Sequence, residues 1–200
     1  ALPISLQFDY FETETRSLVD VDSLRGIHRY RGLLVQKGIQ RMMNNNYKES
    51  EQYIEAVSSV LTGIKQQQHI IDELAEKVVQ AYCDQRVFHV FGTGHSHMLA
   101  EEMFYRAGGL AIINPMLDES IMLHGGARKS TSMERVPDLA QIILKHYDVR
   151  PGDVLLVISN SGVNPLPVQM VLEAKKMGLY VAALTSRATS VLAPKRHESK

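Results

Sequence analysis

The stretch best suited to chemistry is a glycine-rich turn at residues 92–96, with the sequence Gly-Thr-Gly-His-Ser. An apolar run over 87–91 precedes it and a helical pattern beginning at Met98 follows it, so the turn joins a strand to a helix. Such a turn places backbone N–H groups and a serine hydroxyl at a helix N-terminus, where an anion binds well. We therefore expect Gly94 and Ser96 to contact an anionic group of a ligand.

Two further segments carry hydroxyl groups where a predicted strand ends. Ser159-Asn160-Ser161-Gly162 follows the apolar run at 154–158, and Thr185-Ser186 follows the run at 179–184. The carboxyl ends of parallel strands meet at one edge of the sheet, where ligands bind at the switch point of strand order. Three hydroxyl-bearing strand ends at one edge indicate an oxyanion pocket built from hydroxyl and N–H groups, without a permanent cation.

Strands and helices alternate along the chain, which predicts a parallel α/β sheet with right-handed crossovers. The predicted strands cover 87–91, 110–113, 154–158 and 179–184. The predicted helices run from 98 to the Gly108-Gly109 pair, from 139 to 146 and from Pro165 to Gly178. Residues 116–136 show no clear period, and the tail at 187–200 is expected to be irregular and polar.

A long amphipathic helix is predicted before the first strand. Apolar residues recur at three- and four-residue steps from Ile54 to Tyr82, behind a capping pattern at Asn46. The pattern fits one helix or two helices broken near Gly63, packed on their own domain or against a second copy. Residues 1–43 include a basic stretch without aromatic interleaving, so an extension of the domain is favoured over a nucleic-acid-binding arm.

Composition narrows the class of protein. The 200 residues have a formal net charge of zero and 44% apolar residues, so no overall field attracts nucleic acid or a membrane surface. No apolar run is long enough to span a membrane, and the chain does not open with a signal-peptide pattern. The single Cys83 has no partner for an internal disulfide, which fits a reducing compartment. We expect a cytoplasmic protein with no nucleic-acid or membrane partner.

Three motifs resemble the sugar isomerase (SIS) domain. They are the turn at 92–96, the run Pro-Gly-Asp-Val-Leu-Leu-Val-Ile-Ser-Asn-Ser-Gly at 151–162, which is the most specific, and Leu-Thr-Ser at 184–186. The chain is most similar to small bacterial proteins that consist of a single SIS domain. The resemblance implies a flavodoxin-like three-layer sheet, a helical segment at 44–86, and a phosphosugar-binding domain at 87–200. It also implies a homodimer or higher homo-oligomer.

The resemblance also assigns residues to the phosphate of a sugar. In this family the Ser-x-Ser-Gly loop holds that phosphate, which implies a role for Ser159, Asn160 and Ser161 here. The site would be completed by Gly94, Ser96, Thr185 and Ser186. No cofactor is implied. Relatives continue with a fifth strand and a closing helix, so we expect this domain to be C-terminally truncated and to lack its last strand.

Aldose–ketose isomerisation needs a base that moves a proton between adjacent carbons, beside groups that stabilise an enediolate. Glu134 is the first candidate base, and His124, followed by two glycines, is the second. His95 stands beside the glycine turn and could polarise a ring oxygen or open the sugar. His197, in the tail, is a fourth candidate. Each of these residues is also compatible with a solvated loop position.

Other kinds of site fit less well. A dinucleotide-binding turn needs a third glycine where His97 stands, and no acidic residue ends the second predicted strand. A P-loop would need Gly-Lys-Ser/Thr after the turn. His95 and His97, with His124 and His197, are weak evidence for a metal site, because no carboxylate stands at a fixed spacing from them. We therefore expect no metal.

Two functions remain open. The first is a cofactor-independent isomerase, or a related lyase or etherase, acting on a phosphorylated sugar or amino sugar. The second is a non-catalytic module that senses such a phosphosugar. A transcriptional regulator would carry a DNA-binding domain, and residues 1–43 do not show one, which favours the enzyme.

Overall fold

The computed structural model describes residues 48–194 and 196–197. The chain divides into two compact units between Gln68 and His69. In the first unit, residues 48–65 form a helix that ends in a turn at 66–67, so the helical segment is broken just after Gly63. The extension predicted at 1–43 and the cap predicted at Asn46 lie outside the described residues. None of the helices in the described part has the length and apolar character that crossing a bilayer requires.

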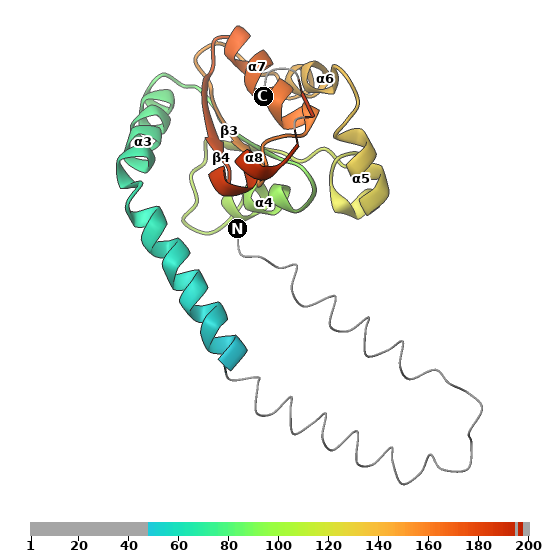
Figure 1. Cartoon of the computed structure of the whole chain (residues 1–200). Helices are drawn as coiled ribbons and strands as arrows, with labels where there is room; N and C mark the ends of the chain where they lie inside the picture. Colours follow the sequence, from blue (N-terminus) through green and yellow to red (C-terminus); the bar gives the residue numbers. More distant parts are fainter. Residues whose placement is uncertain (1–47, 195, 198–200) are drawn as a thin grey trace, which may run out of the picture. The chain divides into compact units, whose positions relative to one another are not determined.

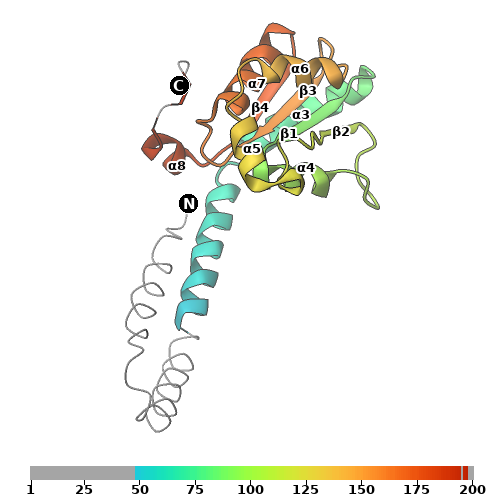
Figure 2. The same cartoon turned by 90° about the vertical axis from the view of Figure 1, so that its right-hand side faces the viewer.

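The second unit is built on a parallel sheet of four strands (Figure 1). The strands are β1 (Phe88–Gly92), β2 (Ile113–Met116), β3 (Val154–Ile158) and β4 (Tyr180–Leu184), and their order across the sheet is β2-β1-β3-β4. Figure 2 shows α6 (Leu139–His146) and α7 (Pro165–Lys176) on one side of the sheet and α4 (Met98–Met103) on the other. The predicted parallel α/β architecture is confirmed, with the switch point between β1 and β3.

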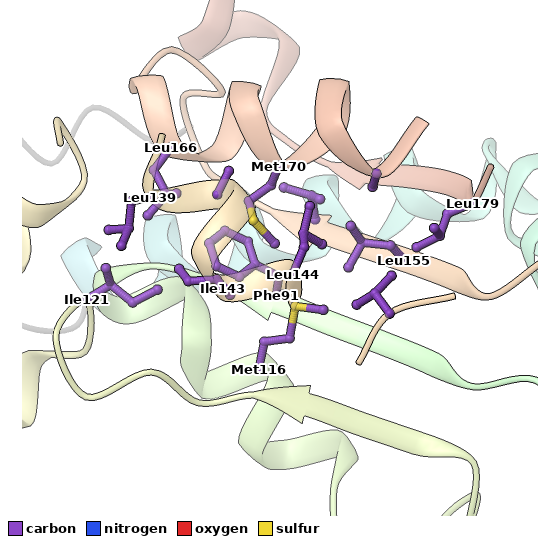
Figure 3. Close-up of a cluster of buried hydrophobic side chains, with 14 residues drawn as sticks. Phe91, Met116, Ile121, Leu139, Ile143, Leu144, Leu155, Leu166, Met170 and Leu179 are labelled. Atoms are coloured by element: carbon purple, nitrogen blue, oxygen red, sulfur yellow. The ribbon is translucent and has the colours of Figure 1, made fainter. Parts of the chain in front are cut away.

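Alternate residues of each strand point to opposite faces and supply two cores. On one face, Phe91 and Leu155 pack with Leu144 of α6 and Met170 of α7 (Figure 3). The other face packs against α4 and α3 (Gln68–Cys83), through Phe88, Val90, Val154, Ile158, Ala100, Val78 and Ala81. Because β1 and β3 are covered on both faces, β3 is a continuous apolar run and β1 is apolar up to Gly92 except for His89.

Local signals explain the ends of α7. Pro165 occupies the first turn, where a helix does not use the N–H that proline lacks. Lys175 and Lys176 lie in the last turn, where positive charge complements the helix dipole. Gly178 follows with a φ of +83°, a conformation that glycine adopts without strain.

The prediction of a strand at 110–113 is wrong. Residues 111–112 form a turn, and the strand is β2, three residues further along. Pro115 is tolerated inside it because β2 is an edge strand that pairs only with β1. The proline misled the prediction, since a proline normally ends a strand.

Three other expectations also need correction. Helix α4 ends at Met103, because Phe104 is extended (φ −100°, ψ 145°), and does not continue to Gly108. The segment 116–136 contains a 3-10 turn, η3 (Leu123–Gly125), and helix α5 (Ala127–Met133), and the tail contains α8 (Arg187–Leu192). These short helices lack an apolar stripe. Side-chain hydrogen bonds hold them: Ser130 Oγ donates to the Ile121 carbonyl at 2.7 Å, and Ser186 Oγ accepts from the Thr189 N–H at 3.3 Å.

Candidate functional site

The glycine turn after β1 is tightly folded. A Cβ atom on Gly92 would lie 2.6 Å from the carbonyl carbon and oxygen of Ser96, so only glycine fits there. Gly94 has a φ of +55°, and its N–H donates to the Ile121 carbonyl at 3.0 Å. Residues Gly94–His97 form a 3-10 turn, η2, that leads directly into α4. This geometry places the half-buried Ser96 at the carboxyl end of β1.

The loops after β3 and β4 are bonded to each other. The carbonyl of Asn160 accepts from Thr185 Oγ1 at 3.2 Å and from the Ser186 N–H at 3.0 Å. Within the first loop, Ser159 Oγ accepts from the Gly162 N–H at 3.1 Å. The two predicted phosphate segments therefore form one connected rim at the carboxyl edge of the sheet.

The predicted phosphate ligands differ in how their hydroxyls are used. Those of Ser159, Thr185 and Ser186 take part in the hydrogen bonds of this rim or of the α8 cap. The hydroxyls of Ser96 and Ser161 make no hydrogen bond to another described residue, and both side chains are half-buried. These two hydroxyls are the ones with full capacity for a ligand oxygen.

A cavity of about 260 Å³ opens beside this rim, between α7 and β4. Ser159, Gly162 and Thr185 form its polar part. Side chains of α7 and β4 form its apolar wall, including Val168, Val171, Leu172, Ala183 and Leu184. The cavity thus joins the loops after β3 and β4 to an apolar surface.

Glu134 lies where the β1 turn meets the β3 loop. Its carboxylate accepts from the hydroxyl of Thr93, in the glycine turn, and from the side-chain amide of Asn164, at the start of α7. Its backbone carbonyl accepts from the Leu166 N–H at 3.1 Å. Asn164 is itself held by Arg196, whose guanidinium donates to Asn164 Oδ1 at 2.7 Å. Glu134 is therefore fixed at the switch point of the sheet, where ligands of such folds bind.

Thr93 belongs to the first of the three hydroxyl-bearing strand ends that the sequence indicates, but its contact with Glu134 was not predicted, and no role was predicted for Asn164. Thr93 stands between the two glycines of the turn, and Asn164 is the residue before Pro165. Neither position has a sequence signal for a contact with Glu134, which is 41 residues from Thr93 and 30 from Asn164. Only the fold brings the three together.

A second polar cluster lies on the other side of the glycine turn. His97 is buried, with 1% of its surface exposed, and its Nδ1 bonds to the Gly94 carbonyl. Its Nε2 lies 3.4 Å from Glu101 Oε1, one helical turn further along. The ring of His124, on η3, meets the His97 ring edge-on with 5.4 Å between the centroids. The sequence signal for His97 and Glu101 is their i, i+4 spacing, which places them on one helical face.

The other two candidate bases are His95 and His197, and His89 was not a candidate. His95 is exposed in η2, and the half-buried His197 follows α8. His89 is buried at the amino-terminal half of β1, where its Nε2 lies 3.2 Å from Asp153 and its Nδ1 3.3 Å from the Asn114 amide. Burial lowers the pKa of His89 below its ordinary value, against the opposing effect of Asp153, so it is a neutral structural residue.

Comparison with known proteins gives one family. The family model described as "SIS domain" matches residues 52–186. The UPF0309 protein of Geobacillus kaustophilus is 41% identical over 161 residues, and that of Caldanaerobacter subterraneus is 42% identical over 159 residues. Each match covers 79% of this chain. The chain spans 61–62% of the length of these two relatives.

Two solved structures are also similar. A phosphoheptose isomerase from Neisseria gonorrhoeae gives a TM-score of 0.46 at 19% identity, over 78% of this chain and 81% of its own. A phosphoheptose isomerase from Francisella tularensis gives 0.43 at 23% identity, over 61% and 65%.

Proposed function

This chain belongs to the SIS domain family, and from that premise we propose that it binds a phosphorylated sugar or amino sugar and isomerises it. The observation that carries the proposal is the position of Glu134. Its carboxylate bridges the glycine turn after β1 and the start of α7 after the Ser-x-Ser-Gly loop. A carboxylate and two candidate anion loops thus meet at the switch point of the sheet.

The phosphate would bind at the carboxyl edge of the sheet. The unused hydroxyls of Ser96 and Ser161 supply two donors from separate loops, and the connected rim of Ser159, Asn160 and Thr185 fixes the spacing of the second loop. Hydroxyl and backbone N–H donors orient a phosphate without a cationic side chain at its centre. Mutual bonding of the loops keeps these donors in place before the ligand arrives.

Glu134 would act as the base. It takes the proton from the carbon next to the sugar carbonyl, and the bonding pair moves to form an enediolate. The resulting carboxylic acid returns the proton to the neighbouring carbon, while the hydroxyl proton passes from one of the two oxygens to the other. Both transfers together complete the aldose–ketose exchange without net oxidation or reduction. Donors from Thr93 and Asn164 fix the orientation of the carboxylate, so its reach toward substrate is set in advance.

The contacts of Glu134 also support a second function, a non-catalytic phosphosugar sensor. Both Glu134 oxygens already have internal donors, as in a carboxylate that only ties two loops together. In that case the pocket senses a phosphosugar and no reaction follows. The two functions predict different turnover for Glu134→Gln, a substitution that removes the charge of the side chain and keeps its shape.

The experiment has two stages. Thermal shift is measured against a panel of sugar phosphates, each paired with its unphosphorylated sugar, because a ligand at ~100 times its Kd adds about 2.7 kcal/mol of stability. Turnover of the stabilising phosphosugar is then compared between the wild type and Glu134→Gln. An isomerase loses about 10²–10⁴-fold in kcat while phosphosugar binding persists. A sensor shows binding by both proteins and turnover by neither, and absence of any phosphate-dependent shift refutes the pocket itself.

We also propose that the chain forms a homodimer or higher homo-oligomer. The support is the number of large apolar side chains exposed on helix 48–65 and on α3, namely Tyr53, Ile54, Val60, Leu61, Ile64, Ile70, Ile71, Val79 and Tyr82. Apolar surface of this extent is typical of an interaction site. Light scattering coupled to gel filtration gives the mass directly, and a monomer at all concentrations contradicts the proposal.

A further inference from the structure

Three side chains outside the proposed sugar site have the arrangement of metal ligands. His97 and Glu101 come from one turn of chain at the start of α4, and His124 comes from η3. One potential ligand atom from each lies within 4.8 Å of the other two. Two imidazoles and a carboxylate are a common protein ligand set for zinc.

The hydrogen bond between His97 Nδ1 and the Gly94 carbonyl determines which ring nitrogen can bind a metal. A carbonyl only accepts, so the bond from Nδ1 to the Gly94 carbonyl requires the proton on Nδ1. The Nε2 atom of the neutral ring then carries a lone pair. It is buried and makes no hydrogen bond of good geometry to any described residue. Metal-binding histidines have this same arrangement, with the second nitrogen donating to a carbonyl or carboxylate.

The contact with Glu101 then lacks a positive charge. A lone pair on Nε2 faces a carboxylate oxygen at 3.4 Å, and two acceptors at that distance repel each other. A cation between them removes the repulsion. A metal ion bound by both groups would be such a cation.

The observed distance fits a bound metal ion. Two ligand atoms bound at ~2.1 Å to one tetrahedral zinc ion lie about 3.4 Å apart, which is the separation observed between Nε2 and Oε1. His124 completes the set from an exposed position followed by Gly125 and Gly126, so small backbone changes can bring its ring nitrogen to bonding distance.

We propose that His97, Glu101 and His124 bind a divalent transition-metal ion of the zinc class, with the fourth position left for water or a ligand. This proposal departs from the sequence-based expectation of no metal. It does not rest on the proposed isomerase function, because the ligand set is argued from its own geometry. The ion would be anchored to the glycine turn through His97 and the Gly94 carbonyl.

The test is zinc binding by the full chain, prepared without a histidine tag and stripped with EDTA. Competition with a chromogenic chelator gives the affinity and stoichiometry, and Co²⁺ absorption reports tetrahedral geometry. We expect one ion per chain. Glu101→Gln and His124→Ala each remove an exposed ligand and should weaken binding by at least ~100-fold, since even outer-shell changes cost 10–100-fold.

Matched controls separate this site from adventitious binding. Glu102→Gln changes the adjacent acid, which pairs with Arg106 instead, and His146→Ala removes an exposed histidine on α6. Both should retain wild-type affinity. The proposal is overturned if the folded wild type, verified by circular dichroism, binds no stoichiometric zinc. It is equally overturned if the control variants lose as much affinity as the ligand variants, or if the ligand variants lose none.

Discussion

Replacing Gly92 by alanine is expected to destabilise the protein by about 1–3 kcal/mol, the usual cost of an overpacked position. The added Cβ would lie 2.6 Å from the carbonyl carbon and oxygen of Ser96 and 2.8 Å from the His97 nitrogen. These are backbone atoms and cannot rotate away. Ordinary contact at ~3.4 Å requires the turn to move by about 0.8 Å, the order of displacement that core overpacking forces on a backbone.

The same displacement should weaken ligand binding, because it moves the backbone of Ser96 and His97, which belong to the two proposed sites. The expected decrease in Tm is about 2–12 °C, because each kcal/mol lowers Tm by about 2–4 °C in a chain of this size. Phosphosugar and zinc binding, measured on the same variant, should both weaken.

Two other glycines serve as controls that separate crowding from backbone conformation. A Cβ on Gly94 meets nothing within 4 Å, but its φ is +55°, so Gly94→Ala should cost about 1 kcal/mol through conformation alone. Gly63 lies in a helix with free space around it, and Gly63→Ala should stabilise by up to ~1 kcal/mol. The steric argument is refuted if Gly92→Ala unfolds within 1 °C (roughly 0.3–0.5 kcal/mol) of the wild type, or is no less stable than Gly94→Ala.

Further predictions concern the site, the core and the response to pH. Thr93→Val removes one donor from Glu134 and should lower kcat about tenfold with little change in KM, measured on the phosphosugar that the screen identifies; an unchanged kcat contradicts the positioning role. Leu166→Ala should cost 2–5 kcal/mol (about the range for a buried leucine), whereas Ile142→Ala, 66% exposed, should stay within about 0.5 kcal/mol, as urea unfolding would show. The pKa of His89 is lowered by burial, so below pH ~6.5 the unfolded chain binds a proton that the folded chain does not. Stability should therefore be full above that pH and fall as the pH drops toward the folded pKa, and His89→Gln should flatten this dependence.

Local patterns in the sequence were enough to predict the layered architecture and the three hydroxyl-bearing loops. The runs at 154–158 and 179–184 and the helix beginning at Pro165 could be predicted because their signals are local. Continuous apolar character marks a strand covered on both faces, and proline and glycine mark the ends of the helix. The parallel arrangement followed from the alternation of these elements.

The position of β2 and the contacts between distant side chains depend on the tertiary structure. A proline is acceptable in β2 because that strand is at an edge, and edge position is a property of the sheet, not of the segment. Helix α5 has no apolar stripe, so its existence depends on hydrogen bonds to residues outside the helix, and the placement of Glu134 depends on its contact with Thr93. The contact between His97 and His124 also depends on the tertiary structure. Side chains far apart in sequence meet according to strand order and the paths of the connecting segments, which local periodicity does not encode.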